Sequence, residues 1–172
     1  MKRWKVVAGL VSVIGLGAVV GANQSVPALT AEQIVPALSA PQRAVDKVPD
    51  KVTGLLTEMG ADRAKTRFIG ETARAKYYAV PSGDKEMCIQ VVGEENLVGC
   101  TPIQGMASNG LRITTADKSE SVWLVGVESL PSKLEEELKA QGAAQTDSVT
   151  SASVWKEQSP HFYVKTTNGT NK

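Results

Sequence analysis

The sequence predicts an α+β fold that is mainly β: a small antiparallel sheet or barrel-like domain with two helices, preceded by an N-terminal signal or anchor helix. Three observations support this prediction. Short β-rich runs recur about every ten residues between clusters of Gly, Pro, Asn and Asp, which is typical of antiparallel sheets. Two segments have apolar residues at helical spacing. A basic head followed by an apolar run opens the chain.

The first element is the apolar N-terminal run. Lys2, Arg3 and Lys5 precede 17 uncharged, mostly apolar residues at 6–22. A secretory signal has about 7–15 apolar residues and a spanning helix needs about 17 or more, so the run lies between the two classes. We expect either a signal cleaved after Ala22 or an uncleaved anchor. Both place the rest of the chain outside the cytoplasm, because the basic head stays inside.

A Pro/Ala-rich segment follows. Residues 23–48 contain three prolines, and Pro49 adds a fourth. Each proline removes a backbone donor and disfavours helix at the residue before it. We therefore expect a tether over 23–48, a compact exported domain over 49–168 and a frayed tail over 169–172.

Two helices are predicted within the compact domain. The first follows Pro49, which suits a first helical turn, and ends before Gly60, which suits the position just past a helix. The second starts at Ser132, which has capping-box spacing to Glu135, and stops at Gly142.

Eight strands are predicted from short β-rich runs. Six precede the second helix and two follow it. The runs are 66–72, 75–80, 87–92, 96–101, 110–115, 121–128, 150–157 and 161–167.

Cys88 and Cys100 are the only cysteines and lie on consecutive strand-like runs. If these runs pair as a hairpin centred on Glu94, the two cysteines are directly opposed, with Cβ atoms about 4.5–5.5 Å apart. A slight adjustment brings them to the roughly 3.5–4.5 Å of a disulfide, and an exported domain meets oxidising conditions. We therefore predict a structural disulfide. Free or reactive thiols and metal ligation are the weaker alternatives, since zinc needs four ligands and a thioredoxin-type site has two residues between its cysteines.

Few other residues indicate chemistry. His161 is the only histidine, so a Ser–His–acid triad would have to use it, and no G-x-S-x-G motif is present. Trp123 and Trp155 suit either a core or a binding surface, and a core is favoured because aromatic residues are few. After residue 22 the chain has 16 basic and 18 acidic residues, which gives no electrostatic reason to bind nucleic acid. No cofactor or metal is expected.

A resemblance covers about residues 67–127. The segments "RFIGET", "AKYYAVPSGDKEMCIQVV", "VGC", "NGLRI" and "VWLVGV" resemble small exported or membrane-anchored proteins of actinobacteria that have a Tyr-Tyr strand and a cysteine pair. No activity is assigned to that family. The resemblance therefore implies a compartment and an architecture, but no mechanism.

The expected function is a non-catalytic binding or interaction module of the cell envelope, either secreted or anchored by residues 6–22. Its partner is an unknown envelope protein or ligand, and the domain is expected to be a monomer that contacts the membrane only through an uncleaved N-terminal segment. The alternatives are a small envelope hydrolase that uses His161 as its base, or an inhibitor or sensor segment for an envelope enzyme.

Overall fold

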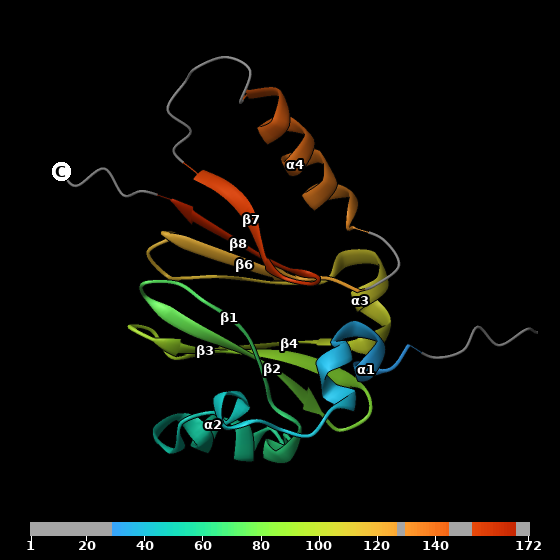
Figure 1. Ribbon diagram of the computed structural model, residues 1–172, viewed down its shortest axis with the longest axis vertical. Helices are drawn as coiled ribbons and strands as arrows, with labels where there is room; N and C mark the ends of the chain where they lie inside the picture. The colour runs from blue at the N-terminus through green and yellow to red at the C-terminus, as the bar shows by residue number, and fades with distance from the viewer. Residues whose placement is uncertain (1–28, 127–129, 145–152, 168–172) are drawn as a thin grey trace, which may run out of the picture.

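The computed structural model describes residues 29–126, 130–144 and 153–167 of the chain. These residues form an α+β fold that is mainly β, as predicted, with two antiparallel four-stranded sheets that are not closed into a barrel. Figure 1 shows the two sheets stacked face to face, with α4 outside one sheet and α2 outside the other. The single sheet or barrel expected from the sequence is thus a two-sheet sandwich.

The first sheet is a meander in the order β1-β2-β3-β4. Short turns join its strands, and a bulge between Phe68 and Gly70 interrupts the pairing of β1 with β2. The strands are β1 (Arg67–Glu71), β2 (Ala75–Ser82), β3 (Glu86–Gly93) and β4 (Leu97–Pro102).

The second sheet has the order β5-β6-β8-β7, so the last strand lies between β6 and β7. The chain leaves the sheet after β6, forms α4, and returns with the β7–β8 hairpin. All eight predicted strands are present. The strands of this sheet are β5 (Leu111–Thr114), β6 (Glu120–Leu124), β7 (Ser153–Ser159) and β8 (Phe162–Thr167).

The helices differ from the prediction in detail. The first predicted helix is a 3-10 turn followed by the short α2, α3 was not predicted, and α4 continues past Gly142 instead of stopping there. The α-helices are α1 (Ala31–Ile34), α2 (Thr53–Glu58), α3 (Ile103–Asn109) and α4 (Ser132–Ala144). The 3-10 helices are η1 (Pro36–Ser39), η2 (Ala44–Asp46), η3 (Asp50–Val52) and η4 (Arg63–Lys65).

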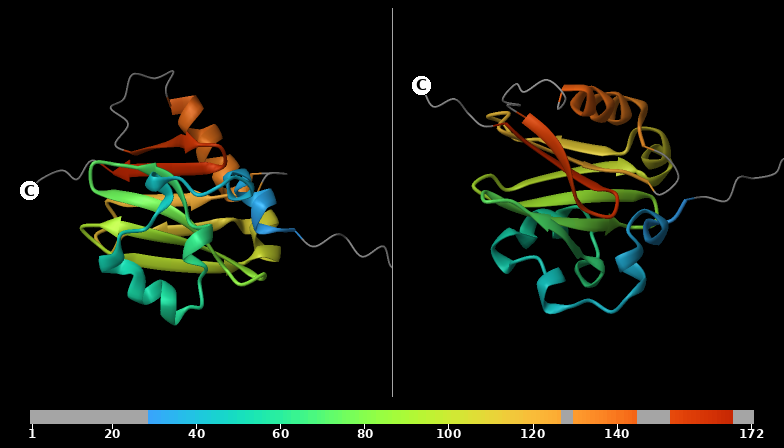
Figure 2. Two further views of the ribbon diagram at one scale, coloured as in Figure 1. Left: turned by 60° about the horizontal axis from the view of Figure 1, so that its bottom comes forward. Right: turned by 45° about the horizontal axis from the view of Figure 1, so that its top comes forward.

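The largest hydrophobic cluster lies between the sheets. Alternate residues of β2, β3, β6 and β8 point into it, as the period of a strand requires. Both views in Figure 2 show α1 and α3 together at one end of the sandwich, where Ile34 and Met106 are fully buried in the same cluster. Its strand residues include Tyr77, Ile89, Val91, Val122, Leu124, Phe162 and Val164.

Residues 29–48, here called the strap, fold onto the first sheet. Ile34 and Leu38 are buried in the inter-sheet cluster, and Val48 is buried under α2. A capping box between Thr30 and Gln33 starts α1. The described part of the predicted tether is therefore packed structure, because its apolar residues have a core to join.

Buried Arg67 fastens the strap. Its guanidinium donates to the carbonyl oxygens of Ala37 (2.8 Å), Leu38 (3.3 Å) and Ala40 in the strap. It also donates to the Thr66 carbonyl at 2.7 Å. The described residues give Arg67 no ion-pair partner. Its charge is satisfied by carbonyl dipoles alone, and this ties the position of the strap to β1.

The predicted disulfide between Cys88 and Cys100 is confirmed, with the two residues directly opposed in the β3–β4 pairing. Their Cα atoms are 4.0 Å apart. Cys88 is fully buried and packs in a cluster with Val52 and Leu56, so the bond lies beneath the layer that contains α2.

Candidate functional site

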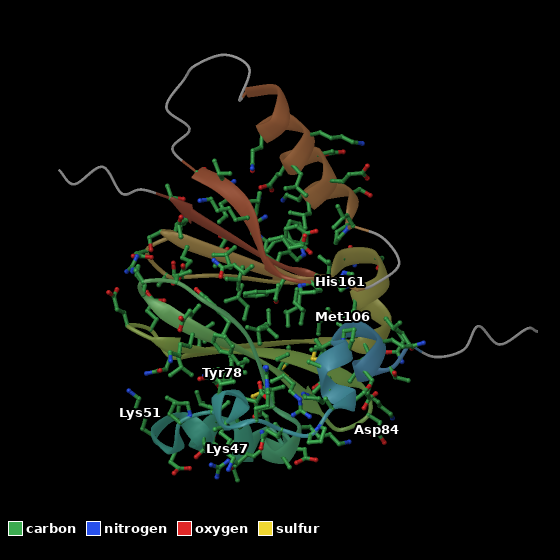
Figure 3. All side chains as sticks on the ribbon, in the orientation of Figure 1. Lys47, Lys51, Tyr78, Asp84, Met106 and His161 are labelled. Carbon is green, nitrogen blue, oxygen red and sulfur yellow. A yellow bond between two sulfur atoms is a disulfide. The ribbon has the colours of Figure 1, made fainter. Side chains whose placement is uncertain are left out.

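An open cavity of about 510 Å³ lies between the strap and the turn that precedes β1, and we call it the strap cavity. Its volume falls within the usual range for small-molecule sites, about 300–1,000 Å³. Figure 3 shows Lys47 of the strap in the lowest layer of that view, with the first sheet between it and His161. The cavity is lined by Gln42, Lys47, Val48, Pro49, Asp50, Arg63, Ala64 and Thr66.

Side-chain hydrogen bonds fix one wall of the strap cavity. The Gln42 amide donates to Thr66 Oγ1 and to the Arg63 carbonyl oxygen, both at 2.8 Å. Thr66 is fully buried and its hydroxyl donates to the Asp46 carbonyl oxygen at 2.7 Å. These bonds join the strap to the segment before β1, so this wall is formed before any ligand arrives.

The charged side chains of the strap cavity are two cations and one carboxylate. Arg63 Nη2 lies 2.6 Å from Asp50 Oδ1, and both side chains are well exposed. Lys47 lines the same cavity and has no ion pair among the described residues. A ligand with an acidic group would therefore find a free ammonium and an arginine that can exchange its partner.

Asp46 is a buried residue of the strap and links the strap to β1. Its buried carboxylate accepts bonds from the backbone and side chain of Arg43 and from the Phe68 backbone N–H. Burial alone would raise the pKa of Asp46, but these donors and the Arg43 charge hold it below its ordinary value. Asp46 is therefore a structural anion, and its oxygens are already occupied.

A second polar cluster lies at the end of the sandwich away from α1 and α3. Arg74 forms ion pairs with Glu94 (2.6 Å) and Asp117 (3.0 Å). The three residues lie in three different turns, between β1 and β2, between β3 and β4, and between β5 and β6. Beneath it, the Tyr77 hydroxyl donates to buried Glu120, whose other carboxylate oxygen has no partner among the described residues. The space beside Glu120 is too small for an organic ligand, so we interpret this cluster as the closure of the core.

His161 lies in the tight β7–β8 turn with a positive φ of 67°. Its backbone N–H donates to Glu157, and its carbonyl accepts from Val125. Within the described residues the imidazole makes no hydrogen bond, and the nearby Ser159 hydroxyl donates to the Ile69 carbonyl at 2.6 Å. The described geometry therefore brings no serine and no acid to the His161 ring.

Trp123 and Trp155 are both buried, with ring centroids 5.8 Å apart. They pack against Leu134 of α4 in a separate cluster. Trp155 Nε1 donates to Glu137 at 2.6 Å. Burial would raise the pKa of Glu137, but this bond and the adjacent cations hold it below its ordinary value. The two tryptophans thus have the core role that the sequence favours.

Sequence reasoning missed the strap cavity, because it assigned three of the eight lining residues, Gln42, Lys47 and Val48, to a tether. Two signals were present in the sequence of the strap: Thr30 and Gln33 have capping-box spacing, and Ile34 and Leu38 have the four-residue spacing of apolar residues on a helix. The expected cleavage site at Ala22, the segment at 6–22 and the tail at 169–172 lie outside the described residues.

The described residues show no metal cluster and no membrane-spanning helix. They hold no group of three or more His, Cys, Asp or Glu side chains placed to bind a metal ion. None of their helices combines the length and the apolarity needed to cross a membrane. Comparison of the chain with models of known protein families, with curated proteins and with solved structures found no match.

Proposed function

We propose that this protein is an exported domain of the cell envelope that binds a ligand or partner without catalysis, and that the strap cavity is its binding site. The basic head and the apolar run at 6–22 support export, with the domain then either released or anchored. The Cys88–Cys100 disulfide supports it independently, because such bonds persist in oxidising compartments. The resemblance to small exported actinobacterial proteins agrees with this compartment.

The strap cavity carries the binding part of the proposal. It is open, has the volume of a small-molecule site, and has one wall held by hydrogen bonds. Among the described residues, its lining holds no histidine, cysteine or serine and offers two cations, one carboxylate, one side-chain amide and one buried threonine hydroxyl. Lys47 and Arg63 favour a ligand that carries an acidic group, such as a small anion or an acidic side chain of an envelope protein.

Capture from intact envelope tests the binding proposal. The full-length protein serves as bait, beside a variant with Lys47→Glu and Arg63→Glu that reverses both cavity cations. A matched control carries Lys133→Glu and Lys156→Glu, two exposed lysines on α4 and β7. We expect the same partner or ligand to be retained by the wild type and the control, and lost by the cavity variant. Equal retention by all three proteins would disprove the assignment of the site.

Export is tested separately. Protease added to intact spheroplasts should digest an anchored domain, whereas a cleaved domain should be found in the medium. A domain that stays protected inside the cell would contradict the proposed compartment.

A further inference from the structure

Both sheets are open, so the sandwich has four edge strands: β1 and β4 in one sheet, β5 and β7 in the other. An edge strand presents unpaired N–H and C=O groups, and proteins normally block them with side chains, bulges, charges or short strands. Within the described residues, one of these four edges is left open.

Three of the edges are blocked in different ways. On β1, the Phe68 N–H donates to Asp46 and the Ile69 carbonyl accepts from Ser159, next to a bulge. On β7, the Gln141 side chain accepts from the Trp155 N–H at 2.8 Å and donates to its carbonyl at 3.1 Å. The third edge, β5, has only four residues, one of which is charged.

The edge of β4 has none of these features over Leu97–Thr101, and its one proline, Pro102, is the last residue of the strand. Its residues are uncharged, and Leu97, Val98, Gly99, Cys100 and Thr101 are all partly exposed. No bulge interrupts its pairing with β3. Among the described residues, none donates to or accepts from the outward backbone groups of this strand.

The register identifies those outward groups. The Ile103 N–H donates to the Lys85 carbonyl at 2.7 Å, which makes the odd-numbered residues of β4 the ones that bond to β3. The short Cα separation of Cys88 and Cys100, 4.0 Å, independently marks that pair as non-hydrogen-bonded. The N–H and C=O groups of Val98 and Cys100 therefore point away from the sheet.

We propose that β4 is the interface for a second copy of this chain, which adds its own β4 in antiparallel orientation about a two-fold axis through Gly99. In this register Val98 of each copy faces Cys100 of the other, and each such pair exchanges both of its hydrogen bonds. The outward groups of one copy are thus the complement of those of the other, as an isologous interface requires.

Charge does not oppose this arrangement. The nearest charged residue along the chain is Glu95, and a two-fold axis at Gly99 places it opposite Ile103 of the second copy. No like charges meet along the two paired strands, and the two first sheets become one continuous eight-stranded sheet. The contact is short, so the dimer should be weak and concentration-dependent, unlike the monomer expected from the sequence.

The test measures the mass of the full-length protein by sedimentation equilibrium in density-matched detergent, over a range of concentrations up to millimolar. Val98→Pro removes the outward N–H of Val98 and leaves the ladder to β3 intact. It deletes two of the four bonds between the copies and should weaken the dimer about 10- to 30-fold. Val98→Thr keeps the N–H and the β-branched shape, so it should dimerise like the wild type.

The outcomes distinguish this edge from other contacts. A monomeric mass for the wild type at every concentration overturns the proposal. A dissociation constant that is the same in Val98→Pro as in the wild type also overturns it and assigns the contact elsewhere, for example to residues 6–22. If circular dichroism shows that Val98→Pro is unfolded, Val98→Lys replaces it, because a charge on the open edge should also prevent pairing.

Discussion

Replacing Arg67 by Met tests whether the strap belongs to the folded domain. Arg67 is only 4% exposed, and three strap carbonyls accept its donors. Each buried acceptor left without a donor costs about 1–3 kcal/mol, so the gross loss is roughly 3–9 kcal/mol. Part of this is offset, since Met no longer has to bury a charge, and a buried charge costs several kcal/mol. We therefore expect a net loss of about 3 kcal/mol in the free energy of unfolding.

Urea unfolding followed by circular dichroism measures this loss. The urea concentration at the midpoint should fall, while the dependence of the free energy of unfolding on urea concentration stays the same. Lys51→Met is the matched control, because Lys51 is exposed, and its change should stay within about 0.5 kcal/mol. Arg67→Lys keeps the charge but has fewer donors, so its free energy of unfolding should lie between those of Arg67→Met and the wild type. A loss below about 1 kcal/mol for Arg67→Met would refute the reasoning and leave residues 29–48 as a tether.

Three further predictions concern bonds described above. Replacing Cys88 and Cys100 by Ala should lower the free energy of unfolding by about 2–4 kcal/mol, measured by thermal melting, and an unchanged melting temperature would remove the structural role of the disulfide. The folded state holds the pKa of Asp46 below the value in the unfolded chain. Asp46 therefore contributes to stability above about pH 4, and this contribution is lost as pH falls. The stability difference between wild type and Asp46→Asn should shrink in acid, and a constant difference would contradict this. Burial and the bond to Glu120 raise the pKa of Tyr77, so this tyrosine should stay protonated, by absorbance titration, as pH passes about 10. The free energy of unfolding should therefore fall above that pH. It should fall less in Tyr77→Phe, which has no hydroxyl to ionise.

The sequence was sufficient for the parts of the fold that local pattern controls. The eight strands follow from alternation and turn residues, and the disulfide follows from the symmetric placement of Cys88 and Cys100 about one turn. Pairing of strands that are distant in sequence was not predictable, because the position of β8 between β6 and β7 depends on tertiary contacts.

The candidate site was not predictable for a related reason. The strap is rich in proline, which locally indicates an extended linker, yet Ile34 is fully buried and Arg67 binds three of the strap carbonyls. That contact joins residues about 30 positions apart, and no periodicity within the strap reveals it. Gly142 shows the same limit, since α4 continues through a residue that usually ends helices.

The position of β8 also sets an order for assembly. The first sheet is a meander of neighbouring strands, so its pairing needs only short loops to close. The second sheet stays incomplete until β8 arrives, after α4 and β7 in the chain. The Ser159 hydroxyl then donates to the Ile69 carbonyl, 90 positions earlier in the sequence. Cys88 is fully buried in the finished protein. Its sulfur faces the layer that contains α2 and not the second sheet. Pairing of β3 with β4 is enough to bring the two cysteines together, so the bond can form before β8 completes the sandwich.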